Sequence, residues 1–380
     1  MARPILRARE ERLSRLLSSS SDEAGVAFYE LRDEAGPTSG FRRFIFSTPE
    51  SRSVCNCPEI VGFEFTNTLK LALTKALKAF PERAKVAAFD ENSILVFNIL
   101  RGGLNFKLRD ALYHAFGFNR TKSSFVSSHR LLSGGEWKIV ENGYKKIKIP
   151  DGSNIFMGDI VATGASLKNA LEEICGFLEE TGRGLRNFFL FTIGTENAER
   201  ILSQFDRRFR ELSPTYENTY LFYIEGRFGL ARADSPLRIK VEDTDLLRHP
   251  ALLAPEFELS QYEALAHPLE RCVVYDGGSR SFDIEEYFED VASYWRELLR
   301  LAEGGATLLD LLCERWPERE YGSFEEFAAE KARAWEGVGE PFLRELFSRK
   351  RERWEEDFLR WARKPEALAL LCHERLAKLK

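Results

Sequence analysis

The stretch 154–170, NIFMGDIVATGASLKNA, places an apolar run, a turn of small residues and a helical pattern in direct succession. The run Asn154–Met157 predicts a buried strand that ends at Gly158-Asp159. Apolar residues recur at helical spacing over Leu167–Leu178, which predicts an amphipathic helix. The chain therefore turns directly from a strand into a helix at the small residues between them.

The turn Ala162–Ser166 has the properties of an anion site. The first turn of a helix leaves several N–H groups without internal partners, and the helix dipole adds positive charge there. Thr163 and Ser166 add hydroxyl donors, and Gly164 allows close approach to the backbone. These features predict a phosphate cradle. The turn has neither the lysine of a P-loop nor a G-x-G-x-x-G pattern, which argues against an ATPase or a dinucleotide fold.

A second strand-to-loop junction lies about 60 residues upstream. Ser93–Leu100 is a short apolar run, and Arg101-Gly102-Gly103 follows it before a helical stretch that ends near Phe116. Arginine is a forked, permanently charged partner for phosphate, and consecutive glycines expose backbone N–H groups. This loop is a second candidate for phosphate binding.

Strands and helices alternate over the body of the chain. Short apolar runs separated by helical patterns predict crossover connections, and hence an α/β fold with a mostly parallel sheet flanked by helices. The further expected strands are Phe44–Phe46, Lys145–Ile149, Phe188–Ile193 and Tyr220–Ile224, and a helix is expected over Thr66–Phe80.

Composition divides the 380 residues unevenly. The chain has a net charge of −5, and residues 281–380 carry 17 Lys+Arg against 23 Asp+Glu, a net of −6. The same hundred residues hold five of the six Trp but only five of the 26 Gly. We expect residues 1–40 to form a helix (5–17) and a linker, 41–280 an α/β domain and 281–380 an all-helical domain.

Within the C-terminal region, Ser323 and Glu326 predict a capping box, and Pro341–Arg363 predicts one long helix. The cluster Arg349–Arg353 is either a nucleic-acid or partner patch or a solvated helix face. The interleaved acids favour the solvated face, with Arg351–Glu355 and Arg353–Asp357 as i,i+4 ion pairs. The pair Cys55-x-Cys57 lacks a second pair at zinc-finger spacing, so we interpret it as structural.

Several classes of protein are disfavoured. No apolar run reaches the length needed to span a bilayer, and residues 1–17 lack the apolar core of a secretory signal. Six scattered cysteines favour a reducing compartment, and a mildly acidic charge argues against a general nucleic-acid coat. We therefore expect a soluble, cytoplasmic protein with no membrane contact.

The two loops resemble those of type I phosphoribosyltransferases. Residues 159–166 are similar to the motif of the uracil and adenine enzymes that binds phosphoribosyl pyrophosphate (PRPP). Ile99-Leu100-Arg101-Gly102-Gly103-Leu104 resembles the pyrophosphate loop of the uracil enzymes. The resemblance covers roughly residues 60–230 and implies an α/β phosphoribosyltransferase fold, a homodimer and transfer of 5-phosphoribosyl from PRPP to a nitrogenous base or related acceptor.

The resemblance also assigns residues. It implies that Asp159, Arg101 and Arg130 are catalytic, that residues 123–149 form a flap, and that Mg²⁺ arrives with PRPP, with Asp159 as the only candidate protein contact. The flap cations would be His129, Arg130, Lys138 and Lys145. The 5-phosphate would be held by Ala162, Thr163, Gly164, Ala165 and Ser166, the pyrophosphate by Arg101, Gly102 and Gly103, and a base by Glu225 or Arg227.

The sequence departs from the family where the first acid of the motif would stand, because that position is Gly158. Ala162 stands where the hypoxanthine/guanine enzymes carry an aspartate, so the chain does not resemble that branch. The departure at Gly158 motivates an alternative function: a PRPP- or nucleotide-sensing regulator whose residues 281–380 bind a protein partner. Plainer interpretations are that the turn binds no phosphate, that Asp159 only caps the helix, and that His129 and Arg130 are ordinary loop residues.

Overall fold

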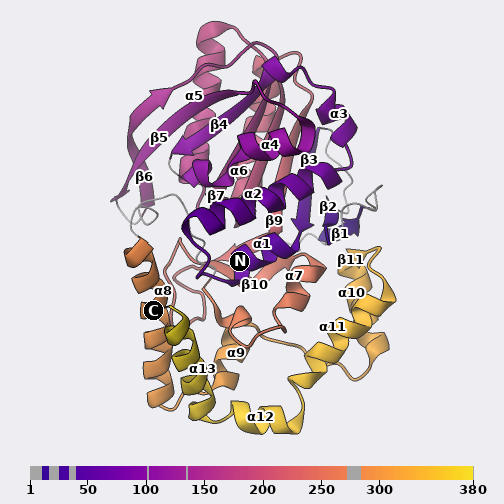
Figure 1. Cartoon of the computed structure of the whole chain (residues 1–380), viewed down its shortest axis with the longest axis vertical. Coiled ribbons are helices and arrows are strands. Elements are labelled where there is room, and N and C mark those ends of the chain that lie inside the picture. The colour runs from indigo at the N-terminus through magenta and orange to yellow at the C-terminus, as the bar shows by residue number, and fades with distance from the viewer. Residues whose placement is uncertain are drawn as a thin grey trace, which may run out of the picture.

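The computed structural model describes residues 11–16, 25–33, 40–100, 102–133, 136–271 and 284–379, with the backbone alone for 128–133 and 136–142. Its centre is a sheet whose middle strands run parallel in the order β3, β9, β8, β7, β4, β5 (Figure 1). These strands span Phe41–Ser47 (β3), Asn218–Leu230 (β9), Leu185–Thr195 (β8), Ser153–Val161 (β7), Ile94–Leu100 (β4) and Lys122–Ser133 (β5).

Antiparallel strands extend the sheet at both edges. On one side β2 (Ala27–Asp33) pairs with β3, β1 (Glu11–Arg15) pairs with β2, and β11 (Trp335–Glu336) lies parallel to β1. On the other side β6 (Glu136–Lys146) forms a hairpin with β5, and β10 (Leu246–Leu253) pairs with β9. The sheet thus joins segments from both ends of the chain.

Helices cover both faces of the sheet. On one face lie α1 (Pro49–Asn56), α2 (Gly62–Ala79), α3 (Arg83–Ala87) and α4 (Leu108–Phe116), and on the other lie α5 (Ala165–Thr181) and α6 (Glu196–Leu212) (Figure 1). Strands covered on both faces read as continuous apolar runs, and β4 (ILVFNIL) is buried along nearly its whole length. The single-turn 3₁₀ helices are η1 (Glu91–Ser93), η2 (Gly102–Phe106) and η3 (His267–Leu269).

The remaining helices gather at the opposite end of the molecule from α5 (Figure 1). They are α7 (Pro255–Ser260), α8 (Ile284–Glu303), α9 (Leu308–Arg315), α10 (Phe324–Ala334), α11 (Glu340–Glu352), α12 (Glu356–Ala362) and α13 (Pro365–Lys378). The predicted α/β class with a C-terminal helical region is confirmed. No helix in the described residues is long and apolar enough to cross a membrane.

The expected N-terminal helix is wrong where the structure describes it. Glu11–Arg15 is a strand with a fully buried Leu13, and Ala27–Asp33, within the expected linker, is also a strand. In a segment of only five residues, one leucine among charged residues is as compatible with an amphipathic helix as with an edge strand. The pairing with β2 and β11 decides between them. The expected strand 145–149 is wrong over most of its length, because β6 ends at Lys146. The other expected strands and the helix 66–80 are confirmed, except that β7 continues through Gly158-Asp159.

Two predictions for the C-terminal region also need correction. The segment 341–363 is two helices, because α11 ends at Glu352 and α12 begins at Glu356. The predicted i,i+4 pair of Arg353 is absent, since its guanidinium is buried and donates to the carbonyl oxygen of Gln261 at 2.5 Å. The break in the helix also removes the spacing on which the Arg351–Glu355 pair depended.

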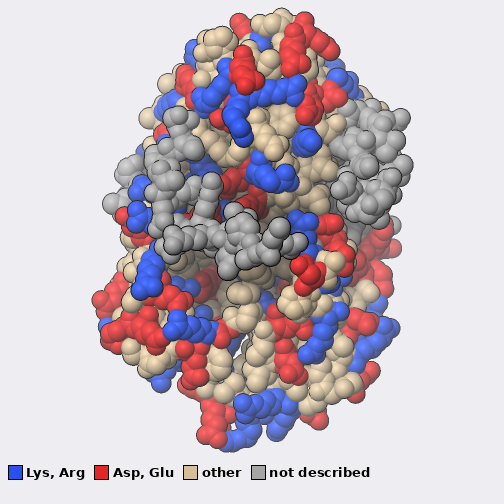
Figure 2. All heavy atoms as spheres, turned by 180° about the vertical axis from the view of Figure 1, so that it is seen from behind, with Lys and Arg blue, Asp and Glu red and all other residues tan. Residues whose placement is uncertain are grey.

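The predicted capping box is half right. Ser323 caps α10 by accepting from the N–H of Glu326 at 3.3 Å, but the Glu326 carboxylate accepts from the N–H of Gly322 instead of Ser323. The exposed face of these helices carries mixed charge, and acidic and basic side chains are interspersed over this end of the molecule in Figure 2. Pairs such as Arg360 with Glu356 (3.0 Å) fit the solvated interpretation.

A buried arginine joins the last helix to the body. Arg375 of α13 donates to both carboxylate oxygens of Glu59 (3.1 and 3.0 Å) and lies 2.5 Å from Oε1 of Glu270. Glu270 also accepts from Nε1 of Trp295 on α8 at 3.2 Å. Burial raises the pKa of Glu270 to about 7, and the nearby Arg375 acts in the opposite direction. The pairing therefore offsets the desolvation of a carboxylate at the junction of α8, α13 and the body.

We predict that Arg375→Met lowers the free energy of unfolding by about 3 kcal/mol, because it leaves Glu270 buried without its counter-charge. Arg360→Met, which removes an exposed arginine with two carboxylate neighbours, should cost no more than about 0.5 kcal/mol. Urea unfolding followed by tryptophan fluorescence measures both variants. Equal stabilities of the two would contradict the role given to Arg375.

Candidate functional site

The two predicted phosphate loops lie side by side. Strands β4 and β7 are parallel neighbours with Phe97 opposite Met157, so the loops that follow them emerge at the same edge of the sheet. The first loop packs on β7 itself, because a Cβ at position 103 would lie 3.1 Å from the carbonyl oxygen of Gly158, which belongs to that strand. The sequence predicted each loop separately, and the register of the sheet brings them together.

The turn before α5 is the stretch that the sequence predicts to bind a phosphate. Gly164 has a φ of +84° and precedes the helix, whose first bond runs from the N–H of Lys168 to the carbonyl of Gly164 at 2.9 Å. The residue at the cap position is Gly164, which has no side chain to cap the helix. The N–H groups of Ala165, Ser166 and Leu167 therefore have no acceptor within the helix, and this arrangement suits a phosphate.

Only glycine fits at position 164. A Cβ there would lie 2.3 Å from Cδ1 of Ile201 on α6, and a positive φ strains any other residue. Thr163 and Ser166, which belong to the same turn, are both half-buried. The backbone of α5 thus starts in close contact with α6.

Asp159 belongs to β7, where it lies opposite Thr192 of β8 and is 9% exposed. It stands three residues before the turn Ala162–Gly164, at the end of the strand that feeds the phosphate cradle. This position agrees with its predicted place beside the cradle. Its assigned contact with ribose stays a prediction.

Packing explains the glycine that replaces the expected first acid. A Cβ at position 158 would lie 2.4 Å from Cγ of Phe106, whose ring is fully buried against β7. Phe106 belongs to η2, the element that directly follows Arg101. The aromatic anchor that seats the pyrophosphate loop therefore occupies the space that an acidic side chain at 158 would need.

The structure describes only some of the basic residues predicted to bind pyrophosphate. Arg101 lies outside the described residues, as do the side chains of His129, Arg130 and Lys138. The predicted flap is the β5–β6 hairpin, which adjoins β4 at the edge of the sheet. Lys145, at the base of this hairpin, pairs with Glu173 of α5.

Glu225 has a buried environment. Its side chain is fully buried at a φ of +63°, and its carboxylate accepts from the N–H of Thr48 at 3.2 Å and from the hydroxyl of Ser51. Burial raises the pKa of Glu225 to about 7, and the guanidinium of Arg52 acts against this shift. The contacts found for Glu225 are with the start of α1, and its assignment to a base stays a prediction.

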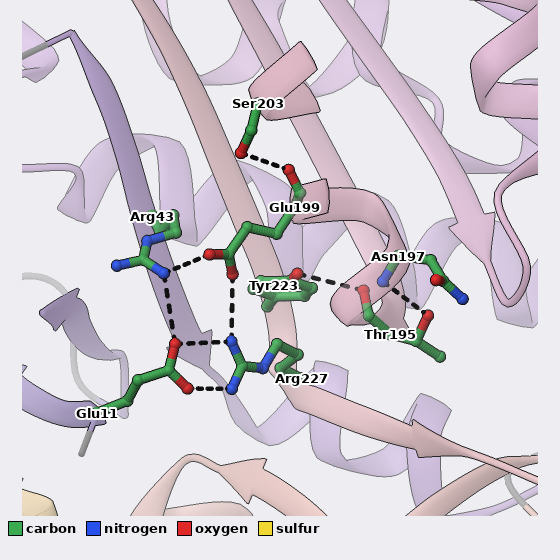
Figure 3. A network of polar contacts seen from close by, with 8 residues as sticks. All are labelled: Glu11, Arg43, Thr195, Asn197, Glu199, Ser203, Tyr223 and Arg227. Atoms are coloured by element: carbon green, nitrogen blue, oxygen red, sulfur yellow. Dashed lines mark hydrogen bonds and ion pairs between the residues drawn. The ribbon is translucent and has the colours of Figure 1, made fainter. Parts of the chain in front are cut away.

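Arg227 lies in a closed network of charges that sequence reasoning missed (Figure 3). It donates to Glu11 at 3.0 Å and to Glu199 at 3.2 Å, while Arg43 contacts the same two carboxylates. The four side chains are 10–14% exposed and come from β1, β3, α6 and β9. Residues so far apart in sequence give no local signal. The assignment of Arg227 to a base stays a prediction.

Thr195 and Asn197 were also missed. They lie at the junction of β8 and α6 and both donate to the carbonyl oxygen of Ala162, at 2.7 and 2.8 Å. The segment 193–198, IGTENA, repeats the pattern of an apolar strand, a glycine-threonine pair and a helix that marked the first loop. That pattern was the available signal.

Comparison with known proteins does not show a family for this chain. Neither a protein-family model nor a curated protein sequence matches it. Among solved structures, the search matches the hypoxanthine-guanine phosphoribosyltransferase of L. donovani at 13% identity and a TM-score of 0.26, over 46% of this chain and 90% of that one. It also matches a Trypanosoma cruzi hypoxanthine phosphoribosyltransferase in complex with IMP, at 16% identity and a TM-score of 0.25, over 53% and 93%.

A third match is a hypothetical protein from Neisseria gonorrhoeae with bound ppGpp, at 12% identity and a TM-score of 0.23, over 32% of this chain and 66% of that one. The aligned region is therefore just under two thirds of that protein. At these scores the likenesses carry no argument about activity, which rests on the site alone.

We predict that Gly158→Ala destabilises the protein by about 1–3 kcal/mol, because the new methyl group overlaps Phe106. The matched control is Gly176→Ala within α5, where a Cβ meets nothing within 4 Å and should be neutral or stabilising. A double-mutant cycle with Phe106→Ala, measured by urea unfolding, should show coupling between 106 and 158. Additive effects would contradict this packing.

Glu225 gives a prediction about pH. A pKa of about 7 in the folded state, above the 4.5 of the exposed group, means that the native protein holds the proton more tightly. Stability should therefore fall as pH rises from about 4.5 to 7, by roughly 3 kcal/mol from this group. Glu225→Gln should remove that part of the slope, whereas the exposed Glu366→Gln should not. Unfolding free energies at pH 5 and pH 7.5 test this, and an unchanged slope in Glu225→Gln would refute it.

Proposed function

We propose that this protein transfers 5-phosphoribosyl from PRPP to a nitrogenous base or related acceptor and releases pyrophosphate. One observation carries the proposal: two loops suited to phosphate leave adjacent parallel strands at one sheet edge, with Gly103 packed on the backbone of Gly158. PRPP carries a phosphate and a pyrophosphate on one ribose, so it needs two neighbouring anion sites.

The uncapped start of α5 is the site proposed for the 5-phosphate. Its N–H groups have no acceptor within the helix, and Thr163 and Ser166 add hydroxyl donors. Asp159 precedes this turn on β7 and accepts from the ribose hydroxyls. Arg101, Gly102 and Gly103 bind the pyrophosphate.

The reaction breaks the bond between C1 of the ribose and the pyrophosphate oxygen and forms a bond from C1 to the acceptor nitrogen. Positive charge develops at C1 as the leaving group departs, so the protein acts mainly by holding the two phosphate groups in place and neutralising the departing charge. Arg101 supplies that charge from the loop, and Arg130 supplies it from the β5–β6 hairpin. The hairpin adjoins β4, so it also provides a cover that excludes water.

PRPP itself would bring a Mg²⁺ ion to this site. No group of three or more His, Cys, Asp or Glu side chains able to hold a metal occurs among the described residues. Asp159 is the protein group placed to contact a PRPP-bound ion. When bound, the ion would neutralise charge on the pyrophosphate.

Phe106 favours a second candidate function. Its ring fills the space beside Gly158, so one carboxylate of the related motif cannot be accommodated. A protein that binds PRPP without turning it over would then be a sensor, with the helices of 284–379 as the surface for a protein partner.

We predict that the wild-type protein releases pyrophosphate from PRPP and Mg²⁺ with at least one member of a panel of purine and pyrimidine bases. Thr163→Ala and Asp159→Asn should each weaken PRPP binding about 10- to 100-fold without unfolding the protein, because each removes a hydrogen bond to a charged or polar group of PRPP. Isothermal titration with PRPP measures the affinity. Thr181→Ala, at the far end of the same helix, is the control and should bind as wild type.

Unchanged PRPP affinity in both site variants would remove the basis for the proposed site. Clear PRPP binding with no pyrophosphate release for any base would refute the proposed enzymatic function and favour the sensor function. A partner that co-purifies only when residues 281–380 are present would add support to the sensor.

A further inference from the structure

The carbonyl oxygen of Ala162 accepts two hydrogen bonds at the end of β7. Oγ1 of Thr195 donates at 2.7 Å and Nδ2 of Asn197 at 2.8 Å. Both donors stand at the start of α6, which follows the neighbouring strand β8 (Figure 3). A helix that carries none of the predicted phosphate contacts therefore holds the first residue of the phosphate loop.

These bonds fix the orientation of the next backbone amide. In a trans peptide the carbonyl and the following N–H point in opposite directions. Because the Ala162 carbonyl points at α6, the N–H of Thr163 points away from α6. Ile201, one turn further along α6, packs on Gly164, where a Cβ would lie 2.3 Å from its Cδ1 atom.

The two donors are themselves held firmly. Oγ1 of Thr195 also caps α6 by accepting from the N–H of Asn197 at 3.2 Å, and the Thr195 carbonyl accepts from the hydroxyl of the buried Tyr223 at 3.2 Å. Glu199 follows on the same helix and is paired with Arg43 and Arg227 (Figure 3). The first turn of α6 is thus bonded to residues of β3 and β9 as well as to the loop.

We propose that Thr195 and Asn197 are positioning residues for the phosphate loop 162–166, acting through the Ala162 carbonyl. The identity of the ligand rests on the proposed function, but the positioning itself does not. A loop held in its binding conformation before the ligand arrives binds more tightly, because less conformational entropy is lost on binding.

The test replaces Asn197 by alanine, which removes one donor and leaves the Thr195 cap intact. Hydrogen exchange of the ligand-free protein should become faster at the amide of Lys168, which donates to the carbonyl of Gly164 in the loop at 2.9 Å, and stay unchanged in the rest of α6. PRPP affinity should fall about fivefold, which corresponds to the loss of one hydrogen bond. The control is Arg200→Ala, which removes the exposed partner of Asn197 Oδ1 (3.1 Å) and should match wild type in both measurements.

A second pair of variants separates the hydroxyl from the packing of Thr195. Thr195→Ser keeps the donor and should retain wild-type exchange and affinity, whereas Thr195→Val keeps the shape and should lose both. Unchanged exchange at Lys168 in Asn197→Ala would overturn the positioning role whether or not PRPP binds. Faster exchange with unchanged PRPP affinity would overturn it as well. A wild-type protein that does not bind PRPP would instead refute the proposed function, and the exchange data would still decide the positioning.

Discussion

The parallel pairing of β4 with β7 is the constraint on which the proposed site depends. It sets Phe97 opposite Met157, so both strands end at one edge and their loops emerge as neighbours. The contact of Gly103 with the carbonyl of Gly158 is tight, because a Cβ at position 103 would lie 3.1 Å from that oxygen. A slip of one residue in this register would move the apolar side chains of β4 to the opposite face of a sheet that is covered on both faces.

Close packing also limits what chemistry the site can hold. Phe106 anchors the loop proposed to bind pyrophosphate by filling the space beside Gly158, and Ile201 fills the space beside Gly164. Both glycines are therefore required by their neighbours, and at 158 this requirement excludes a second acid. The structure gives a steric cause for the main departure from the motif that the sequence resembles.

Buried charge ties the C-terminal helices to the body. Arg375 contacts Glu59 and Glu270, and Lys331 of α10 pairs with Glu258 of α7, whose side chain is 12% exposed, at 2.7 Å. Burying such groups costs free energy that their pairing offsets. Strand β11, which lies in the same C-terminal region, continues the sheet beside β1. The helical region is thus joined to the α/β body by hydrogen bonds and by charge.

The sequence by itself determined the α/β class and the buried central strands and indicated two candidate loops for phosphate, because apolar runs and small-residue turns are local patterns. It could not determine the strand at Glu11–Arg15, whose five residues fit a helix equally well, or the break between α11 and α12. It also did not predict the network of Glu11, Arg43, Glu199 and Arg227. Nor did it predict the hydrogen bonds from Thr195 and Asn197 to Ala162. Those features join residues from separate elements, and only the pairing of the strands in the folded sheet brings such residues within reach of one another.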